Sequence, residues 1–90
     1  DRNIAIIAEI KTRLRDADVQ QLLDTLAAFP VFFPEHSQKR CYGLLVGGNT
    51  PESVRNLALS QGLYVGRMTD DTFELMVPAG FEGKNFQAGV

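Results

Sequence analysis

The sequence has few of the residues that mark several protein classes. Cys41 is the single cysteine in 90 residues, so the chain cannot form an intramolecular disulfide or supply the thiolates of a zinc cluster. This scarcity favours a reducing compartment, and we expect a cytoplasmic protein. No apolar run approaches the roughly 18 residues of a membrane-spanning helix, which predicts no membrane association. No basic segment followed by a small-residue cleavage site is visible, so the sequence shows no targeting signal.

Neither sign of charge is in large excess. Charged residues make up 22% of the chain, and the net charge is only −2. The hydrophobic fraction of 44% excludes a disordered acidic tail and a collagen-like or low-complexity fibre. A chain of this size buries about 60 to 65% of its unfolded surface, which is marginal for an independent α/β domain. We expect residues 1–90 to form a single domain, or part of one.

The chain begins without an initiator methionine and passes directly from Asn3 into an apolar run at 4–8. A run that is apolar at consecutive positions predicts a strand, here over about residues 3–12, with both faces buried under helices. Such a strand belongs in the interior of a sheet and needs a neighbour on each side. We therefore expect residues 1–90 to be the C-terminal part of a larger domain.

An amphipathic helix is predicted after the polar segment 13–18. Asp16 and Asp18 can cap its N-terminus, and Pro30 is expected to end it. Its apolar residues fall near helical spacing on one stripe. They are Val19, Leu22, Leu23, Leu26, Ala27 and Phe29.

The rest of the chain predicts one more helix and three more strands. An apolar strand covers 41–47, residues 47–49 turn the chain, and Thr50 is expected to cap a helix with Pro51 at its first position. Gly62 suits the end of that helix. Strands at 63–68 and 72–77 flank the turn at 70–71 and predict a hairpin. After residue 78 the chain is rich in glycine and polar residues, with Phe81 and Phe86 as docking anchors.

The predicted element order is therefore β-α-β-α-β-β. Alternating strands and helices predict an α/β fold with a mostly parallel sheet in three layers, and the last two strands add a C-terminal hairpin.

Glu9 and Lys11 stand out at the carboxyl end of the first strand. Residues two apart on a strand project from the same face, so these side chains lie together while Ile10 faces the other layer. Charges near a core are costly unless they are paired or bound to a metal. On spacing alone, an ordinary ion pair at the end of a strand is the simpler interpretation.

At these residues the chain resembles the PD-(D/E)XK nuclease superfamily, which has the restriction-endonuclease-like fold. Residues 6–14 match the E-x-K motif strand, which a helix and a parallel strand follow. The chain is also similar to a set of bacterial proteins in that superfamily. In these proteins a Tyr-Gly strand, a helix ending in Ala-Leu-x-x-Gly-Leu and an Asp-Thr-Phe-Glu-Leu segment recur, as they do here at 42–43, 58–63 and 71–75. The resemblance covers about residues 3 to 86.

The resemblance implies divalent-metal-dependent hydrolysis of phosphodiester bonds in nucleic acid, with DNA as the expected substrate. It makes Glu9 and Lys11 the catalytic residues. Glu9 and the carbonyl of Ile10 would hold Mg²⁺ or Mn²⁺, both of which prefer oxygen ligands. Lys11 would orient the attacking water or offset the negative charge that develops on the phosphate.

One part of the family pattern is missing. The superfamily also uses an aspartate, on a strand upstream of E-x-K, to hold the metal together with the glutamate. The only acidic residue before Glu9 is Asp1, and eight residues of extended strand separate the two by about 26 Å. One metal ion cannot bridge that gap, so we expect the aspartate to lie upstream of residue 1.

Basic residues in the loops offer a second, weaker signal. Arg13 and Arg15, and further along Lys39 and Arg40, are candidates for contacts to phosphates, whose contribution would depend on salt. Solvated loop charges are the simpler interpretation, because the chain has no overall basic character. Gln20 and Gln21 are expected either to reach the site or to lie on the helix surface.

Two further readings of function stay open. One is a nuclease-like fold that does not catalyse a reaction and serves as a binding or oligomerisation module, for which we expect a homodimer or a partner complex. The other is a nucleotide-binding domain that uses the glycine turn at 47–50, although this turn lacks the spacing and the lysine of a P-loop. His36 reads as a loop residue, and Cys41 as a packed thiol.

Overall fold

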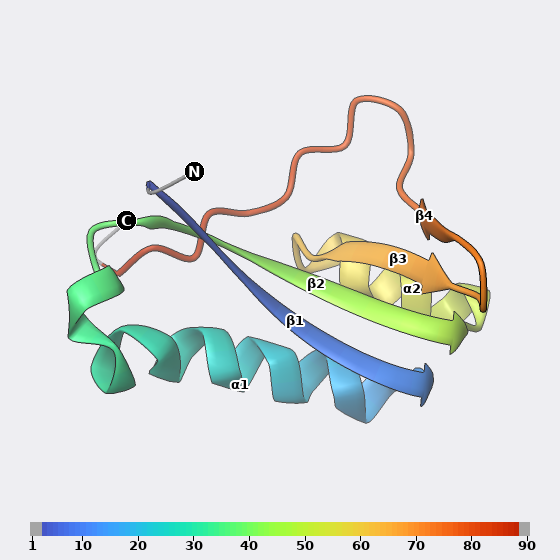
Figure 1. The fold of residues 1–90 in the computed structure, drawn as a ribbon, viewed down its shortest axis with the longest axis horizontal. Coiled ribbons are helices and arrows are strands. Elements are labelled where there is room, and N and C mark those ends of the chain that lie inside the picture. The colour runs from blue at the N-terminus through green and yellow to red at the C-terminus, as the bar shows by residue number, and fades with distance from the viewer. Residues whose placement is uncertain (1–2, 89–90) are drawn as a thin grey trace.

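The strands and helices follow one another in the predicted order. The computed structural model describes residues 3–88 and shows an α/β fold with a four-stranded mixed sheet and two α-helices (Figure 1). A 3₁₀ helix, η1, follows the first α-helix. The elements are β1 Ile4–Arg13, α1 Asp16–Phe32, η1 Pro34–His36, β2 Arg40–Asn49, α2 Glu52–Ser60, β3 Tyr64–Met68 and β4 Phe73–Leu75.

The sheet has the strand order β1-β2-β3-β4, in which the first three strands are parallel. Ile4 pairs with Arg40 at the start of the β1–β2 ladder. β3 and β4 pair in antiparallel fashion with Met68 opposite Phe73, which confirms the predicted hairpin. The carboxyl ends of β1, β2 and β3 therefore lie at the same end of the sheet.

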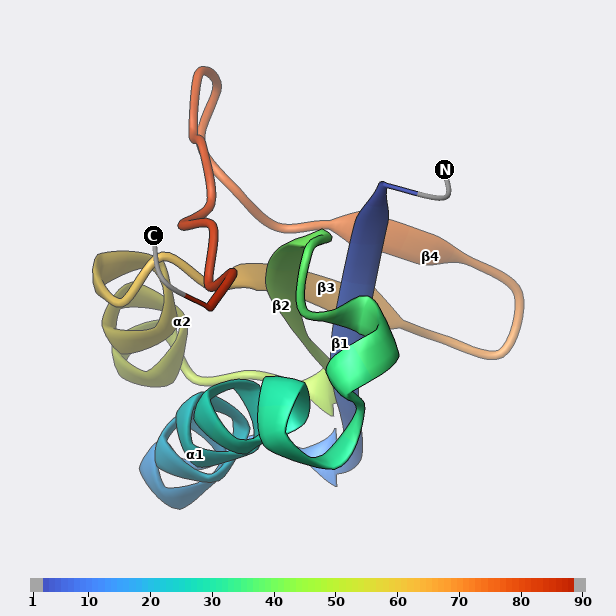
Figure 2. The same cartoon turned by 90° about the vertical axis from the view of Figure 1, so that its left-hand side faces the viewer.

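Both α-helices cover the same face of the sheet (Figure 2). Alternate strand residues point toward them and form the core with the inner stripe of each helix. This core consists of Leu14, Val19, Leu22, Leu26, Cys41, Leu45, Val54, Ala58, Leu63 and Val65, all buried. Among residues 3–88 the fold thus has two layers, whereas the sequence predicted three.

β1 occupies an edge of the sheet and not its interior. Within the described chain it pairs with β2 alone, so its other backbone edge is open. Its side chains alternate: Ala5 and Ile7 pack against the core, and Ile6 and Ile10 on the opposite face are each 64% exposed. The apolar pattern of β1 correctly indicated a strand that is apolar on both faces, but only one of these faces is covered.

Pro30 does not end α1, which continues to Phe32. Proline lacks a backbone N–H and so removes one helical hydrogen bond, but its fixed φ angle is compatible with a helix. The last turn is completed by the N–H of Phe33, which donates to the carbonyl of Phe29 at 2.8 Å. The prediction of the helix end is therefore wrong by two residues.

The glycines at 47 and 48 belong to β2 and not to a turn. A Cβ atom on Gly47 would lie 2.9 Å from Cγ of Leu14, so the glycine allows the connection between β1 and α1 to approach the strand. The connection between β2 and α2 is residues 50–51, so the predicted turn at 47–49 is wrong. Pro51, and not Thr50, is the N-cap of α2, and no side chain caps this helix.

The segment after β4 runs back along the amino ends of β2 and β3 (Figure 1). The N–H of Phe86 donates to the carbonyl of Cys41 at 2.7 Å, and the N–H of Cys41 donates to Oδ1 of Asn85 at 2.9 Å. Phe86 also packs against the core, as predicted for a docking anchor.

The same segment is fixed at two more points. Gly62 follows α2 with φ +82°, a left-handed conformation that favours glycine, and its carbonyl accepts a hydrogen bond from the N–H of Lys84 at 2.9 Å. The ring of Phe81 packs edge-on against Tyr64 with 5.2 Å between the centroids. Both predicted phenylalanine anchors are therefore in contact with the sheet.

Candidate functional site

Glu9 and Lys11 lie side by side on the helix-covered face of β1, near its carboxyl end. Lys11 Nζ is 3.7 Å from Glu9 Oε1, and the two side chains are 43% and 21% exposed, respectively. Their spacing on an alternating strand explains the pairing. The predicted juxtaposition of these two residues is confirmed, and so is the placement of Ile10 on the opposite face.

A third charged residue, Asp18, joins this pair. Its Oδ1 lies 3.9 Å from Lys11 Nζ, and the residue is only 8% exposed. Its Oδ2 accepts a hydrogen bond of 2.8 Å from the N–H of Arg15, at the start of α1. The Lys11 ammonium therefore lies between two carboxylates, one on its own strand and one on the following helix. We call these three residues the Glu9–Lys11–Asp18 cluster.

The sequence identified Asp18 as a helix-capping residue but not as part of the site. The N-cap is Arg15, so neither Asp16 nor Asp18 occupies that position. Asp18 lies inside the first turn, where its side chain accepts a hydrogen bond from the N–H of Arg15. Its contact with Lys11 depends on the short connection at 14–15, which brings the first turn of α1 back onto β1. A carboxylate seven residues from a lysine has no periodic signature on a strand, so spacing alone does not reveal this contact.

The cluster offers oxygen donors to a cation, but the donor set is incomplete. In residues 3–88 no group of three or more histidine, cysteine, aspartate or glutamate side chains is placed to hold a metal ion. Glu9 is one hard oxygen donor, and the carbonyl of Ile10 follows it in the chain. Asp18 uses Oδ2 for its capping bond and turns Oδ1 toward Lys11. The described residues thus fit half of a Mg²⁺ site and need at least one more carboxylate to complete it.

The basic residues that were predicted to contact phosphates lie at two ends of the sheet. Arg13 and Arg15 are exposed at the carboxyl end of β1, next to the cluster. Lys39 and Arg40 lie at the amino end of β2, where Arg40 pairs with Ile4. Seven strand residues, or about 23 Å, separate that pair from Lys11. Only the first two arginines are therefore placed to act with the cluster.

The other candidates lie outside the cluster. The side chain of Gln20 donates to Asp24 at 2.9 Å on the exposed face of α1 and so does not reach Lys11. His36 lies against the ring of Phe29, with 5.9 Å between centroids. Cys41 is buried, as predicted, and this burial raises the pKa of its thiol.

A separate open hollow of about 250 Å³ lies at the carboxyl ends of β2 and β3, near the start of α2. Residues 48–50 line it, together with Arg55 and Arg67. The hypothesis of a nucleotide-binding domain predicted a bound phosphate group at this place. Because 47–49 is strand and α2 begins without a glycine turn, the backbone does not form the predicted phosphate loop.

Comparison with known proteins adds no assignment. No protein-family model, curated protein or solved structure gives a significant match to the chain. Among the described residues, neither helix has the length and apolarity required to cross a membrane.

Proposed function

We propose that this chain contributes the E-x-K half of a divalent-metal-dependent nuclease site of the PD-(D/E)XK type, acting on DNA. The observation that carries the proposal is the Glu9–Lys11 pair, with 3.7 Å between Nζ and Oε1, at the carboxyl end of a strand that a helix and a parallel strand follow. Arg13 and Arg15 are exposed beside this pair and supply positive charge toward a phosphate backbone.

The open edge of β1 supports the same proposal. The superfamily places its second acidic ligand on a strand beside the E-x-K strand, and the free edge of β1 offers a place for such a strand to pair. A carboxylate brought there on the helix-covered face would lie next to Glu9. We propose that Glu9 and the carbonyl of Ile10 hold Mg²⁺ or Mn²⁺ together with that residue.

The chemistry follows from the charges. A bound divalent ion would activate a water molecule and withdraw charge from the phosphate. Lys11 is 43% exposed and carries a compact positive charge close to Glu9, so it can approach the phosphate oxygens on which negative charge develops. The second carboxylate near Lys11, that of Asp18, holds the ammonium toward α1.

The test is cleavage of plasmid DNA by the full-length protein with Mg²⁺ or Mn²⁺. Glu9→Gln and Lys11→Met should each lower the rate by at least about 100-fold, the size expected for a group that stabilises developing charge. The matched controls are Glu74→Gln and Arg67→Met. These residues form a similar pair, with 3.8 Å between the charged atoms, on β4 and β3. Equal cleavage by wild type and all four variants would refute the proposal.

A catalytically inactive binding or oligomerisation module is the second candidate, and the uncovered face of the sheet favours it. Isothermal titration of the full-length protein with Mn²⁺ separates the two. A binding site that Glu9→Gln abolishes supports the nuclease, and the absence of metal binding together with a defined oligomer supports the module.

A further inference from the structure

The face of the sheet opposite the helices is almost free of charge. By strand alternation, Arg40 at the amino end of β2 is the one charged side chain that the described strands place on this face. The other positions are Ile4, Ile6, Ala8, Ile10, Thr12, Tyr42, Leu44, Val46, Gly48, Tyr64, Gly66, Met68, Phe73 and Leu75. We call this surface the open face.

The open face has a hollow in each half. Toward the amino ends of the strands, an apolar groove of about 310 Å³ is lined by Ile4, Ile6, Tyr42, Leu44, Tyr64 and Leu75. Toward the carboxyl ends, a second hollow of about 380 Å³ has Ile10 and Met68 in its lining. Exposed apolar side chains stand in both halves, because Ile6 and Ile10 are each 64% exposed and Met68 is 45% exposed.

We propose that the open face binds the open face of a second copy of this chain, with the strands of the two copies running in opposite directions. A two-fold axis that lies between the sheets and runs across the strands places the carboxyl half of one copy over the amino half of the other. Ile10 and Met68 of each copy then lie over the groove of its partner. This arrangement packs two sheets face to face, with the helices outside.

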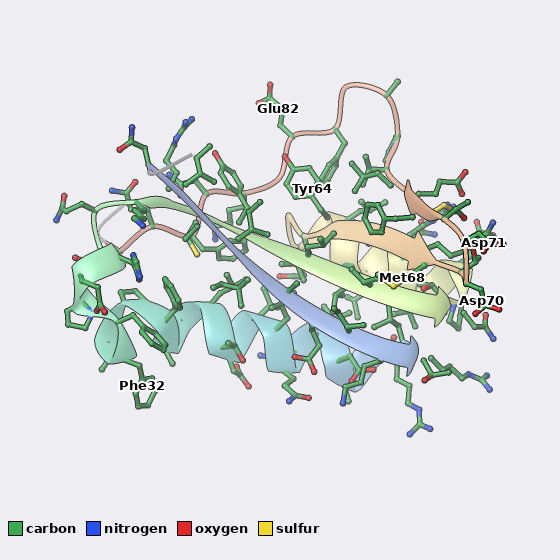
Figure 3. All side chains as sticks on the ribbon, in the orientation of Figure 1. Phe32, Tyr64, Met68, Asp70, Asp71 and Glu82 are labelled. Carbon is green, nitrogen blue, oxygen red and sulfur yellow. The ribbon has the colours of Figure 1, made fainter. Side chains whose placement is uncertain are left out.

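The charges at the two ends of the open face select this orientation. Arg40 lies at the amino end, and Asp70 and Asp71 lie in the turn after β3 at the other end (Figure 3). Strands that run in opposite directions bring Arg40 of one copy toward these aspartates of the other. Strands that run in the same direction would place the aspartates of both copies at the same end of the interface and Arg40 of both at the other, which is unfavourable.

The size of the open face sets the strength of the contact. The four strands contain 10, 10, 5 and 3 residues. At about 3.3 Å per residue and about 4.8 Å between strands, they outline roughly 450 Å² per copy. The dimer would bury roughly 900 Å² in total, below the approximately 1,200 Å² of a stable specific interface. We therefore expect a weak dimer that forms and dissociates with concentration. The dimer proposal does not depend on the nuclease proposal, because the Glu9–Lys11–Asp18 cluster lies on the other face of the sheet.

The test is sedimentation equilibrium of the chain over a concentration series that reaches about 1 mM, in buffer of low salt. Ile6→Lys places a charge in the apolar contact and should raise the dissociation constant at least about tenfold. The matched control is Phe32→Lys, which changes an apolar side chain that is 74% exposed at the end of α1, away from the open face (Figure 3). Circular dichroism checks that both variants are folded.

A charge exchange tests the orientation. Arg40→Asp and Asp70→Arg should each weaken the dimer, and the double variant should restore it. Sedimentation as a monomer throughout the series would overturn the proposal. So would equal effects of Ile6→Lys and Phe32→Lys, as would a double variant no stronger than the single ones. Monomeric chain that binds an apolar helix from another protein would assign the open face to that partner.

Discussion

Lys11 Nζ lies 3.9 Å from Asp18 Oδ1, and this contact joins β1 to the first turn of α1. Asp18→Asn removes the charge but keeps an oxygen that can accept the hydrogen bond from the N–H of Arg15. We expect it to lower the free energy of unfolding by no more than about 1 kcal/mol, because Lys11 is partly exposed. Asp18→Ala also loses the cap and should cost about 1 kcal/mol more.

Urea denaturation followed by circular dichroism measures both changes. Asp24→Asn is the control, because Asp24 lies on the exposed face of the same helix and bonds only to Gln20 in the described contacts. Equal losses for the asparagine and alanine variants at position 18 would contradict a separate role for the capping bond.

Gly43→Ala tests how tightly α1 packs on β2. The added Cβ atom would lie 2.6 Å from Cδ2 of Leu63 and 2.7 Å from Cδ1 of Leu26, so the core must shift. We expect a loss of about 1 to 3 kcal/mol in the free energy of unfolding, the cost of overpacking. In a Leu26→Val background one of these clashes disappears, and the cost of Gly43→Ala should fall. If the loss of unfolding free energy in the double variant equals the sum of the losses in Gly43→Ala and Leu26→Val, this packing is contradicted.

Cys41 should make the protein less stable at alkaline pH. Its burial raises the pKa of the thiol in the folded state. Above about pH 8.5, the ordinary thiol pKa, the unfolded chain loses a proton that the folded chain retains. The contribution of the thiol to the free energy of unfolding is therefore fully present below that pH. It is lost as the pH rises toward the folded-state pKa, by at most about 1.4 kcal/mol per pH unit.

Urea denaturation of wild type and Cys41→Ala between pH 7 and 10 measures this effect. The difference in unfolding free energy between the two proteins should change with pH above 8.5. Curves that stay parallel over the whole range would show that Cys41 is not the cause.

Arg13 and Arg15 should contribute to DNA binding if the chain acts as proposed. Each arginine that contacts a phosphate releases counterions, so Arg13→Ala or Arg15→Ala should reduce the slope of log affinity against log salt by about one. Fluorescence anisotropy with a labelled duplex at several salt concentrations gives these slopes. Lys39→Ala is the matched control at the far end of the sheet, and an equal reduction there would point to non-specific attraction.

The element order and the pairing of Glu9 with Lys11 could be predicted because they depend on local patterns. Alternation along a strand determines which side chains share a face, and the turn at 70–71 between two apolar segments was enough to indicate the hairpin. Both features need contacts only between neighbours in sequence or across one turn. The nuclease assignment rests on resemblance and stays a prediction.

Features that depend on contacts between distant elements could not be predicted. The apolar residues of β1 indicated burial on both faces, but no described helix covers the face that carries Ile6 and Ile10, and the C-terminal segment contacts that face at Tyr64. Gly47 and Gly48 resemble turn residues, and only the approach of Leu14 to Gly47 and of the Thr12 carbonyl to Gly48 shows why a strand has glycine there. Asp18 lies in the site because the first turn of α1 packs back onto β1. The spacing of residues along the sequence does not predict that contact.

The hydrogen bond between Gly62 and Lys84 has a consequence for sequence variation. Gly62 and Gly80 have nearly the same positive φ, at 82° and 80°. A Cβ atom at position 80 would meet nothing within 4 Å, whereas at position 62 it would lie 3.0 Å from the N atom of Lys84 and closer still to its side chain. In a library of variants, position 80 should accept asparagine or aspartate, which tolerate this conformation. Position 62 should accept glycine alone, and its tolerance should widen only when the C-terminal segment is displaced.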